Sequence, residues 1–558
     1  MRYQDMAALW ADHPRFDENT RAEVRALFGD SDELLSRFGR ELAFGTGGMR
    51  GLRGTGTNRM NRYTVARVSQ GLAAYLLERG GQSVAIAYDS RIGSREFALV
   101  TAGVLAHNGI RAWCFDRLMP TPVLSFAVRE MGCDAGVMIT ASHNPAQYNG
   151  YKVYGPDGCQ VTDDAAKAIT SHIERVDYAQ LAWMSEDEAR TAGLLNAMPE
   201  SVYRRYIELT LSCRLESGDG PWDLRFVYTP LHGTGLEPVC DVFSRMGALA
   251  SCTIVPEQRE PDGNFPTCPR PNPELPEALA LALRTAEGED AALVLATDPD
   301  SDRVGVAVRE EGGGYRLLTG NEVGLLLLMY ILSVRMQMGT LPGAPVVIKT
   351  IVTSDLTFAI ARDFGTEVVE VLTGFKYIGE AIGCLEKEGQ ADRFILGFEE
   401  SCGYLAGSHV RDKDGVMTAM LVADMVRHYA RRGQSVSEVL GQIYETYGYM
   451  ENRLLNFDIV SALPMQTMDE IMATLRENPP AALGGIPIRT RRDYLQGLSG
   501  LPPADVLSFE NERGDKAIIR PSGTEPKMKI YLCACGKNPD EAKEKLTSMA
   551  AEASDWVG

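Results

Sequence analysis

The sequence has no long hydrophobic run and no ordered cysteine pattern. Its longest apolar stretch, residues 324–334 (GLLLLMYILSV), is far shorter than the ~20 residues that span a bilayer, so we predict a buried core helix there. The 11 cysteines are scattered, and the nearest pair, Cys533 and Cys535, matches no zinc or redox spacing. We therefore expect reduced core thiols. The first residues also lack the basic start and apolar run of a signal peptide. These absences argue against secreted and membrane-spanning classes and predict a cytoplasmic protein.

Basic residues are outnumbered by acidic ones. The chain has 56 Lys and Arg against 75 Asp and Glu, which gives a formal net charge of −19. Such a balance argues against nucleic acid and anionic membrane surfaces as partners. A small anionic ligand stays open, because basic side chains cluster locally in two places. The two groups are Arg50, Arg53, Arg59 and Arg62, and Lys516, Arg520, Lys527 and Lys529.

The length of 558 residues is too great for one core, since domains run to roughly 100–200 residues. We expect three to five domains. Residues 1–40 look helical, with apolar residues at helical spacing and Ser31 as an N-cap. Beyond them, strand-like runs alternate with longer helical patterns, which is typical of α/β organisation. For the C-terminal part of the chain, around residues 520–531, we predict a smaller α+β domain.

One α/β unit is repeated three times. Three segments begin with Asp, continue into apolar residues and end in a polar loop: residues 134–144 (DAGVMITASHN), 290–300 (DAALVLATDPD) and 392–401 (DRFILGFEES). Each follows a companion strand with its own polar end, and these companions end at Arg91, Gly233 and Ser354. Near-continuous apolar strands suit sheets covered on both faces, and ligands bind beyond the carboxyl ends of such strands. The three polar loops are therefore expected at equivalent places where chemistry occurs, unless the strands are similar by chance.

Asp298, Asp300 and Asp302 alternate in the motif TDPDSDR. In extended backbone their carboxylates point the same way, and three like charges repel unless a cation neutralises them. Oxygen ligands favour magnesium, calcium or manganese over zinc. An EF-hand loop is excluded, because Arg303 and Arg309 stand where it needs Gly and Glu. The alternative is a solvated acidic turn without a metal.

Ser142 lies in TASHNP, just beyond an apolar strand and between small residues that leave its hydroxyl accessible. The nucleophile elbow of α/β-hydrolases is absent, because Thr140 and Asn144 occupy its glycine positions. The alternative is an Asn-Pro turn that happens to contain serine and histidine.

Three other segments could contact a sugar phosphate. The glycines of residues 44–61 would let backbone amides approach a phosphate, although the segment matches neither a Walker loop nor a dinucleotide fingerprint. GFEESCGY, residues 397–404, offers a carboxylate and a hydroxyl for sugar hydroxyls, or is an acid-rich helix N-terminus. RPSGTEPK, residues 520–527, suits a phosphate dianion, or is a surface turn.

TASHNP, TDPDSDR, GFEES and RPSGTEPK, in this order and at domain-sized separations, resemble the α-D-phosphohexomutase family, which includes phosphoglucomutases and phosphomannomutases. The resemblance covers the chain from about residue 40 to the end. FGTGGMRG and GFEESCGY are most similar to the bacterial phosphoglucomutase branch, which is also similar to phosphopentomutases.

The resemblance implies an α/β protein with four domains around a central cleft. The first three would share a repeated α/β unit, and the fourth would be a smaller α+β domain. The expected segments are a helical extension at 1–40, a phosphoserine domain at 41–212, a metal-binding domain at 213–322, a sugar-binding domain at 323–447 and a phosphate-binding domain at 448–558.

The resemblance also implies roles for individual residues. Ser142 would carry the phosphoryl group and join Asp298, Asp300 and Asp302 in binding Mg²⁺. Lys152 and Arg50 would serve proton transfer and charge stabilisation, with the Lys152 pKa lowered by neighbouring cations. Further expected catalytic residues are His143 and Arg303. The expected substrate-binding residues are Glu399, Ser401, Thr373, Gly374 and Lys376 for the sugar, and Arg520, Ser522, Gly523 and Thr524 for the unreactive phosphate.

The implied activity is interconversion of α-D-glucose 1-phosphate and glucose 6-phosphate, with glucose 1,6-bisphosphate as intermediate and activator. The partner is a small phosphosugar, and we expect a monomer or dimer. Phosphomannomutase and phosphopentomutase are the alternatives, although Gly403 and Tyr404 stand where some dual glucose/mannose mutases place histidine. A serine-phosphate hydrolase and a non-catalytic sugar-phosphate binder are rival classes. The intact set of serine, aspartates and Lys152 argues against the binder. The sequence leaves open the preferred sugar, the oligomeric state, the phosphorylation of Ser142, the degree of domain closure and the role of residues 1–40.

Overall fold

The computed structural model describes residues 2–45, 47–215, 222–458, 467–498, 500–522 and 527–557. The chain forms two compact units. Unit 1 comprises residues 1–318, 379–391 and 402–427, and unit 2 comprises residues 319–378, 392–401 and 428–558.

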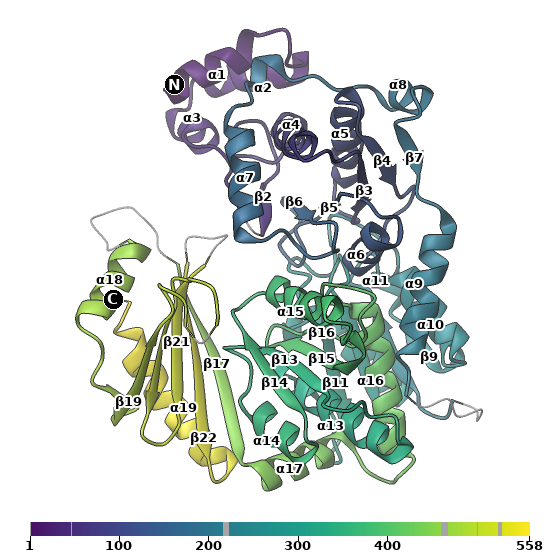
Figure 1. The fold of residues 1–558 in the computed structure, drawn as a ribbon, viewed down its shortest axis with the longest axis vertical. Helices are drawn as coiled ribbons and strands as arrows, with labels where there is room; N and C mark the ends of the chain where they lie inside the picture. Colours follow the sequence, from purple (N-terminus) through teal and green to yellow (C-terminus); the bar gives the residue numbers. More distant parts are fainter. Residues whose placement is uncertain are drawn as a thin grey trace. The chain divides into compact units, whose positions relative to one another are not determined.

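Unit 1 begins with three short helices, as predicted for residues 1–40. They are α1 (Tyr3–Asp12), α2 (Glu18–Leu27) and α3 (Ser31–Phe38), which lie together in Figure 1. The prediction of Ser31 as N-cap is wrong by one residue. Asp30 caps α3, since its carboxylate accepts hydrogen bonds from the amides of Asp32 and Glu33. A carboxylate at this position also interacts favourably with the helix dipole.

The first sheet of unit 1 has seven strands in the order β1-β2-β6-β5-β3-β4-β7. Strands β3, β4, β5 and β7 are parallel, whereas β6 and β2 run antiparallel to their neighbours. Helices α5 and α6 pack on the central strands, and α4 packs on α5 and α7. The strands are β1 (Phe44–Gly45), β2 (Gly48–Leu52), β3 (Ser83–Tyr88), β4 (Arg111–Cys114), β5 (Ala135–Ile139), β6 (Tyr148–Tyr154) and β7 (Leu195–Ala197). The helices are α4 (Arg62–Glu78), α5 (Ser94–His107), α6 (Thr121–Glu130), α7 (Asp163–Glu174), α8 (Glu186–Thr191) and α9 (Glu200–Ser212).

The second sheet of unit 1 has five strands in the order β12-β11-β10-β8-β9. Strands β8, β9 and β10 are parallel, and β11 runs antiparallel to β10. The strands are β8 (Phe226–Thr229), β9 (Cys252–Ile254), β10 (Leu293–Thr297), β11 (Val304–Arg309) and β12 (Tyr315–Leu318). The helices of this part are α10 (Leu236–Arg245), α11 (Pro256–Arg259) and α12 (Pro276–Glu289). Unit 1 also contains β16 (Gly403–Leu405) and α16 (Gly415–Ala430) up to residue 427.

Unit 2 contains a parallel sheet in the order β14-β13-β15. The predicted core helix at residues 324–334 is confirmed as part of α13. Most of this segment is buried, from Gly324 to Val334. The elements are α13 (Gly320–Met338), β13 (Val346–Thr350), α14 (Leu356–Asp363), β14 (Glu367–Val371), α15 (Phe375–Lys387, which enters unit 1 at residue 379), β15 (Phe394–Glu399) and α17 (Val436–Tyr447).

The C-terminal part of unit 2 is an antiparallel sheet in the order β17-β22-β21-β20-β19-β18. Helix α19 packs along its face (Figure 1), and a separate core forms between them around Leu532, Met549 and Ile471. The elements are β17 (Tyr449–Asp458), α18 (Met468–Glu477), β18 (Ala482–Leu483), β19 (Ile486–Asp493), β20 (Leu507–Asn511), β21 (Lys516–Pro521), β22 (Lys527–Gly536) and α19 (Pro539–Ser554). This is the predicted α+β domain.

The threefold repeat read from the sequence is confirmed in the strand pairing. In each α/β unit the companion strand pairs in parallel with the strand that precedes the polar loop: β3 with β5, β8 with β10 and β13 with β15. The polar loops follow the carboxyl ends of β5, β10 and β15. The fold class of repeated α/β units plus an α+β domain is therefore as predicted. The domain boundaries and the central cleft remain predictions.

Candidate active site

Ser142 lies three residues beyond the end of β5, in a tight loop. Its backbone φ is +50°, in the left-handed region that non-glycine residues rarely adopt. Its amide donates a hydrogen bond to Thr140 Oγ1 at 2.8 Å, so the threonine that occupies a glycine position of the hydrolase elbow shapes this turn. The serine is only 3% exposed.

Arg91, at the polar end of β3, holds the Ser142 loop in place. Its guanidinium donates to the carbonyl oxygens of Ser142, Asn144 and Pro145, and it pairs with Asp89 at 3.3 Å. Burial lowers the Arg91 pKa to about 10, so the guanidinium stays charged at neutral pH. We noted Arg91 in the sequence as the polar end of a companion strand but assigned no role to it. Its equivalent position in the repeated unit was the signal that could have indicated one.

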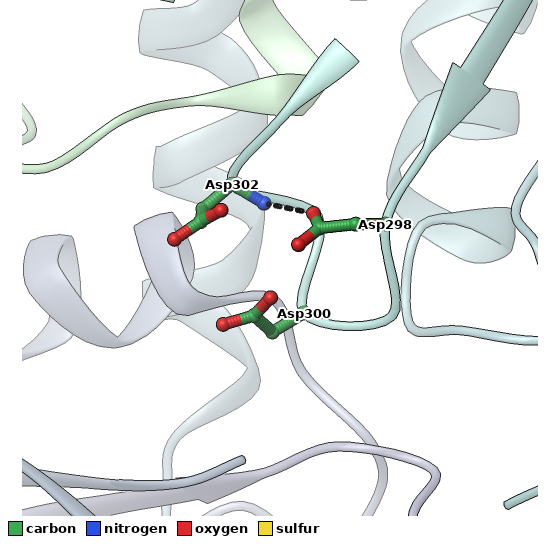
Figure 2. Close-up of side chains that lie close together, drawn as sticks. All are labelled: Asp298, Asp300 and Asp302. Carbon is green, nitrogen blue, oxygen red and sulfur yellow. Dashed lines mark hydrogen bonds between the residues drawn. The ribbon is translucent and has the colours of Figure 1, made fainter. Parts of the chain in front are cut away.

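The three aspartates gather at the end of β10 (Figure 2). One oxygen from each carboxylate lies within 4.8 Å of the others, and all three residues are buried. The expected extended alternation is wrong. The chain turns, with the Ser301 amide donating to the Asp298 carbonyl at 2.9 Å and with φ of +53° at Ser301. The Asp302 amide then donates to Asp298 Oδ1 at 3.1 Å, so a turn, not strand periodicity, brings the carboxylates together.

The donor set of this cluster fits a hard cation. Within the described residues, Asp300 Oδ1 and Asp302 Oδ1 are buried without any hydrogen-bond partner, and buried acceptors are rarely left so. Burial, and then the charges of Asp300 and Asp302, raise the Asp298 pKa well above its usual range. The Ser142 hydroxyl donates to Asp298 Oδ2 at 2.7 Å, which places a fourth oxygen at the cluster. Oxygen ligands of this kind suit Mg²⁺.

Two lysines contact the opposite oxygens of the cluster. Lys152, on β6, has its Nζ 2.8 Å from Asp300 Oδ2 and 3.4 Å from Asp302 Oδ2. Burial lowers the Lys152 pKa, but the charges of Asp300 and Asp302 outweigh this effect and raise it. The expected lowering by neighbouring cations is thus wrong for the arrangement seen here, because carboxylates face the ammonium. A cation bound to these carboxylates would offset their effect.

Lys413 is the second lysine, and sequence reasoning missed it. Its Nζ lies 3.2 Å from Asp302 Oδ2. It belongs to the run RDKDG, residues 411–415, whose alternating charges before a helix were the only signal in the sequence.

His143, Arg50 and Arg303 also lie around the serine. His143 Nδ1 is 3.2 Å from the Ser142 hydroxyl, and Arg50, on β2, donates to Asn144 Oδ1 at 2.8 Å. Arg303 donates to Glu274 at 2.6 Å. Burial, followed by the charges of Arg303 and Arg50, lowers the His143 pKa well below its usual range. Unit 1 therefore brings together all the predicted catalytic and metal-binding residues, which are Arg50, Ser142, His143, Lys152, Asp298, Asp300, Asp302 and Arg303.

Two further segments donate hydrogen bonds to the aspartate loop. Thr121, at the start of α6, donates its hydroxyl to Asp300 Oδ2 at 3.0 Å. Thr234, in the run LHGTG, donates its amide to the Pro299 carbonyl at 2.9 Å. Gly233 permits this approach, because a Cβ there would lie 2.4 Å from the Pro299 Cα. Neither segment was assigned a role from the sequence.

The residues predicted to bind the sugar lie in unit 2. Glu399 is the last residue of β15, and the Ser401 hydroxyl donates to its Oε1 at 2.8 Å. Thr373 and Gly374 connect β14 to α15, and the Thr373 hydroxyl is buried without a hydrogen-bond partner among the described residues. Lys376, in the first turn of α15, stacks on Tyr377 with its Nζ 4.6 Å from the ring centroid.

Arg520, on β21, lies in the same unit. Its guanidinium donates to the Tyr531 hydroxyl at 2.9 Å. Burial raises the Tyr531 pKa to about 12, and the Arg520, Glu400 and Glu399 charges also act on it. Arg520 and the acids of GFEES thus all act electrostatically on Tyr531. The Ser522 amide donates to the Lys527 carbonyl at 2.8 Å. Gly523 and Thr524 lie outside the described residues.

Comparison with known proteins identifies the family. Three family models match, described as phosphoglucomutase/phosphomannomutase alpha/beta/alpha domains I, II and III, at residues 41–180, 204–313 and 319–447. The chain belongs to this phosphoglucomutase/phosphomannomutase, or α-D-phosphohexomutase, family. It is therefore an isomerase of the phosphotransferase type.

Individual relatives cover nearly the whole chain. A probable phosphoribomutase of Schizosaccharomyces pombe is 36% identical over 97% of this chain and 95% of its own. A phosphoglucomutase of Staphylococcus aureus is 35% identical over 94% of this chain and 96% of its own. Among solved structures, a phosphoglucomutase/phosphomannomutase family protein of Burkholderia thailandensis has a TM-score of 0.66 at 19% identity, covering 92% of this chain and 97% of its own. Across the described part of the chain, no helix has the length and apolarity to cross a membrane.

Proposed function

We propose that this protein interconverts α-D-glucose 1-phosphate and glucose 6-phosphate, with phosphorylated Ser142 as the phosphoryl donor. The observation that carries the proposal is the buried Ser142 hydroxyl hydrogen-bonded to Asp298 at 2.7 Å, inside a three-carboxylate cluster. A serine there can carry a phosphoryl group next to a charge-neutralising cation. The 35% identity to a phosphoglucomutase over 94% of the chain supports glucose as the sugar.

The reaction consists of two phosphoryl transfers. In the first, the P–O bond to Ser142 breaks and a new P–O bond forms to O6 of glucose 1-phosphate, which gives glucose 1,6-bisphosphate and the free serine hydroxyl. The sugar hydroxyl loses one proton, and the serine oxygen takes one up. The bisphosphate then turns over, its 1-phosphoryl group passes to Ser142, and glucose 6-phosphate leaves. Such transfers depend on in-line positioning and charge stabilisation.

The residues around Ser142 would have different roles in these transfers. Lys152 is proposed to take the proton of the attacking hydroxyl as a neutral amine and to return it as an ammonium, because its Nζ is buried beside the cluster. A cation bound to the aspartates would offset the charges that otherwise keep Lys152 protonated. Arg50 and His143 flank the serine and would orient the phosphoryl oxygens together with Arg303. Arg91 donates hydrogen bonds to the carbonyls of Asn144 and Pro145 and would thereby keep these oxygens from facing the phosphate.

We propose Mg²⁺ as the metal, held by Asp298, Asp300, Asp302 and an oxygen on Ser142. When bound, Mg²⁺ would supply positive charge to the phosphoryl oxygens. Asp300 Oδ1 and Asp302 Oδ1 have no hydrogen-bond partner within the described part of the chain. They are the oxygens that Lys152 and Lys413 leave available as ligand atoms.

The residues of unit 2 are proposed to hold the rest of the substrate. Glu399 and Ser401 would accept and donate hydrogen bonds to sugar hydroxyls in either orientation of the bisphosphate. Thr373, Gly374 and Lys376 would set sugar preference. Arg520, with Ser522, Gly523 and Thr524, would bind the phosphate that does not react. We further propose that the protein acts in the cytoplasm as a monomer or dimer.

A phosphopentomutase is the second candidate. One relative, 36% identical over 97% of the chain, is named a probable phosphoribomutase, and the same two transfers would interconvert pentose 1- and 5-phosphates. The mannose alternative has less support, since Gly403 and Tyr404 replace the expected histidine.

A phosphorus NMR time course tests the proposal. The protein with Mg²⁺ and a trace of glucose 1,6-bisphosphate receives glucose 1-phosphate in one sample and ribose 1-phosphate in another. Growth of glucose 6-phosphate without inorganic phosphate is the expected result. Faster conversion of ribose 1-phosphate would replace glucose by pentose as the substrate, whereas release of inorganic phosphate would indicate a hydrolase and overturn the mutase.

A further inference from the structure

We propose that Tyr154 and Asp412 are positioning residues which, through Lys413, hold Asp302 in its metal-binding orientation. This inference rests on the proposed function of the aspartate cluster and extends it to residues outside the cluster.

A continuous chain of contacts links Tyr154 to the cluster. The Tyr154 hydroxyl donates to Asp412 Oδ2 at 2.8 Å. The other oxygen of the same carboxylate, Oδ1, accepts from Lys413 Nζ at 3.2 Å. Lys413 Nζ in turn lies 3.2 Å from Asp302 Oδ2. One carboxylate thus fixes the ammonium that contacts a proposed metal ligand.

The four side chains that make these contacts are isolated from water. Tyr154 is 0% exposed, Asp412 3%, Lys413 9% and Asp302 2%. At this burial an ion pair or hydrogen bond is hardly screened, and a lost partner is not replaced by solvent. Loss of the Tyr154 donor would therefore leave Asp412 to reorganise within the protein, with Lys413 as its movable neighbour.

The lysine contact decides which oxygen Asp302 offers to a cation. Lys413 and Lys152 both lie against Asp302 Oδ2, whereas Oδ1 has no hydrogen-bond partner among the described residues and only a long contact of 3.9 Å to Arg303. With Lys413 fixed on Oδ2, the carboxylate cannot rotate without separating this pair. Residues that orient metal ligands in this way typically change metal affinity or activity by about 10–100-fold when removed.

Asp414, two residues after Asp412, belongs to a similar tyrosine–aspartate pair that provides a matched control. Tyr206 is also 0% exposed, and its hydroxyl donates to Asp414 Oδ1 at 2.9 Å. Asp414 is buried too, but its second role is to accept from the Met417 amide at the start of α16. Tyr206→Phe removes the same buried tyrosine–aspartate hydrogen bond without touching Lys413.

The test measures Mn²⁺ binding by electron paramagnetic resonance in the full-length wild type, Tyr154→Phe and Tyr206→Phe. Thermal melts confirm folding, and glucose 1-phosphate turnover is followed in parallel. We expect Tyr154→Phe to weaken Mn²⁺ binding about tenfold and to raise the Mg²⁺ concentration needed for half-maximal turnover, with Tyr206→Phe within about twofold of wild type. If Tyr154→Phe does not fold, Asp412→Asn replaces it, since it keeps an acceptor for Tyr154 but removes the charge that attracts Lys413.

Each outcome decides between the alternatives. Unchanged Mn²⁺ binding in Tyr154→Phe, or equal losses in both tyrosine variants, would overturn the inference. A wild type that binds Mn²⁺ but does not convert sugar phosphates, with binding still weakened in Tyr154→Phe, would overturn the proposed function and leave the positioning role supported.

Discussion

Ser142 combines two features that a structural serine would not need. Its φ of +50° places it in the left-handed region, which costs an ordinary residue about 1–2 kcal/mol. Its hydroxyl is also buried against a cluster of like charges. Strain of this kind concentrates at functional sites, where the surrounding structure maintains it. Here the hydrogen bonds from Arg91 to the loop carbonyls supply that support.

Ser142→Ala should abolish mutase turnover while leaving the fold intact. The variant keeps the loop backbone but removes the only atom that can carry the phosphoryl group in our proposal. Turnover is measured by phosphorus NMR and folding by a thermal melt. Turnover near the wild-type rate in a folded Ser142→Ala would show that another residue carries the phosphoryl group.

At the scale of single elements, α16 begins with a titratable cap. Asp414 accepts hydrogen bonds from the Met417 amide and the Tyr206 hydroxyl, and burial raises its pKa to about 6. Because this value lies above that of an unfolded aspartate, about 3.9, the folded state binds more protons than the unfolded state between pH 4 and 6. The stabilising contribution is present below pH 4 and is lost as the pH rises through 6.

Asp414→Asn tests this dependence. The amide keeps an oxygen for the cap but cannot ionise. The free energy of unfolding of the variant, relative to wild type, should therefore increase by roughly 3 kcal/mol as the pH rises from 4 to 7. Urea melts at several pH values measure the difference. His409, whose pKa burial lowers to about 4, has the opposite dependence but is common to both proteins. A difference that does not change with pH would contradict the assignment.

The helices of the N-terminal extension are part of the first core. Trp10 is 0% exposed and contacts the rings of Phe16, Phe38, Tyr63 and Tyr178 at centroid distances of 4.5–5.6 Å. Through Tyr63, on α4, and Tyr178, between α7 and α8, the extension packs on segments that lie between strands of the seven-stranded sheet in the sequence. The role of residues 1–40 that the sequence left open is thus, at least, structural.

Trp10→Ala should lower stability by about 3–5 kcal/mol, because it leaves a large cavity among aromatic rings. Phe28→Ala is the matched control: Phe28 lies on the same extension but is 48% exposed, so its removal should change little. Melting temperatures of both variants provide the measurement. Equal effects from the two substitutions would mean that the extension does not depend on the Trp10 core.

At the scale of the whole molecule, metal binding should be visible as stability. Three buried carboxylates repel one another in the folded state, and a bound cation removes this repulsion. With Mg²⁺ at about 100 times its Kd, binding adds about 2.7 kcal/mol to the free energy of unfolding. Treatment with EDTA should therefore lower the Tm, and Mg²⁺ should restore it.

Two asparagine variants separate this effect from general ion binding. Asp300→Asn should lose the Mg²⁺-dependent rise in Tm together with turnover. Asp290→Asn should keep both, because Asp290 is an exposed residue at the C-terminus of α12. A full Mg²⁺ response in Asp300→Asn would remove the aspartate loop as the metal site.

The sequence by itself determined the repeated unit and the loops that carry polar groups. Apolar runs ending in TASHNP, TDPDSDR and GFEES are local features, and a buried strand followed by a polar loop needs no knowledge of the rest of the chain. For the same reason Ser142, Asp298 and Glu399 could be named before their surroundings were known.

Only the tertiary structure decided what those loops face. Ser142 and Asp298 meet across 156 positions of sequence, and Tyr154 meets Asp412 across 258. Such contacts depend on strand register and helix packing, which local pattern does not encode. The turn at Ser301, the carboxylates around Lys152 and the contact of Lys413 with Asp302 arise in this way. Long-range packing therefore sets the charge around each group, and with it the chemistry that the motifs alone could only suggest.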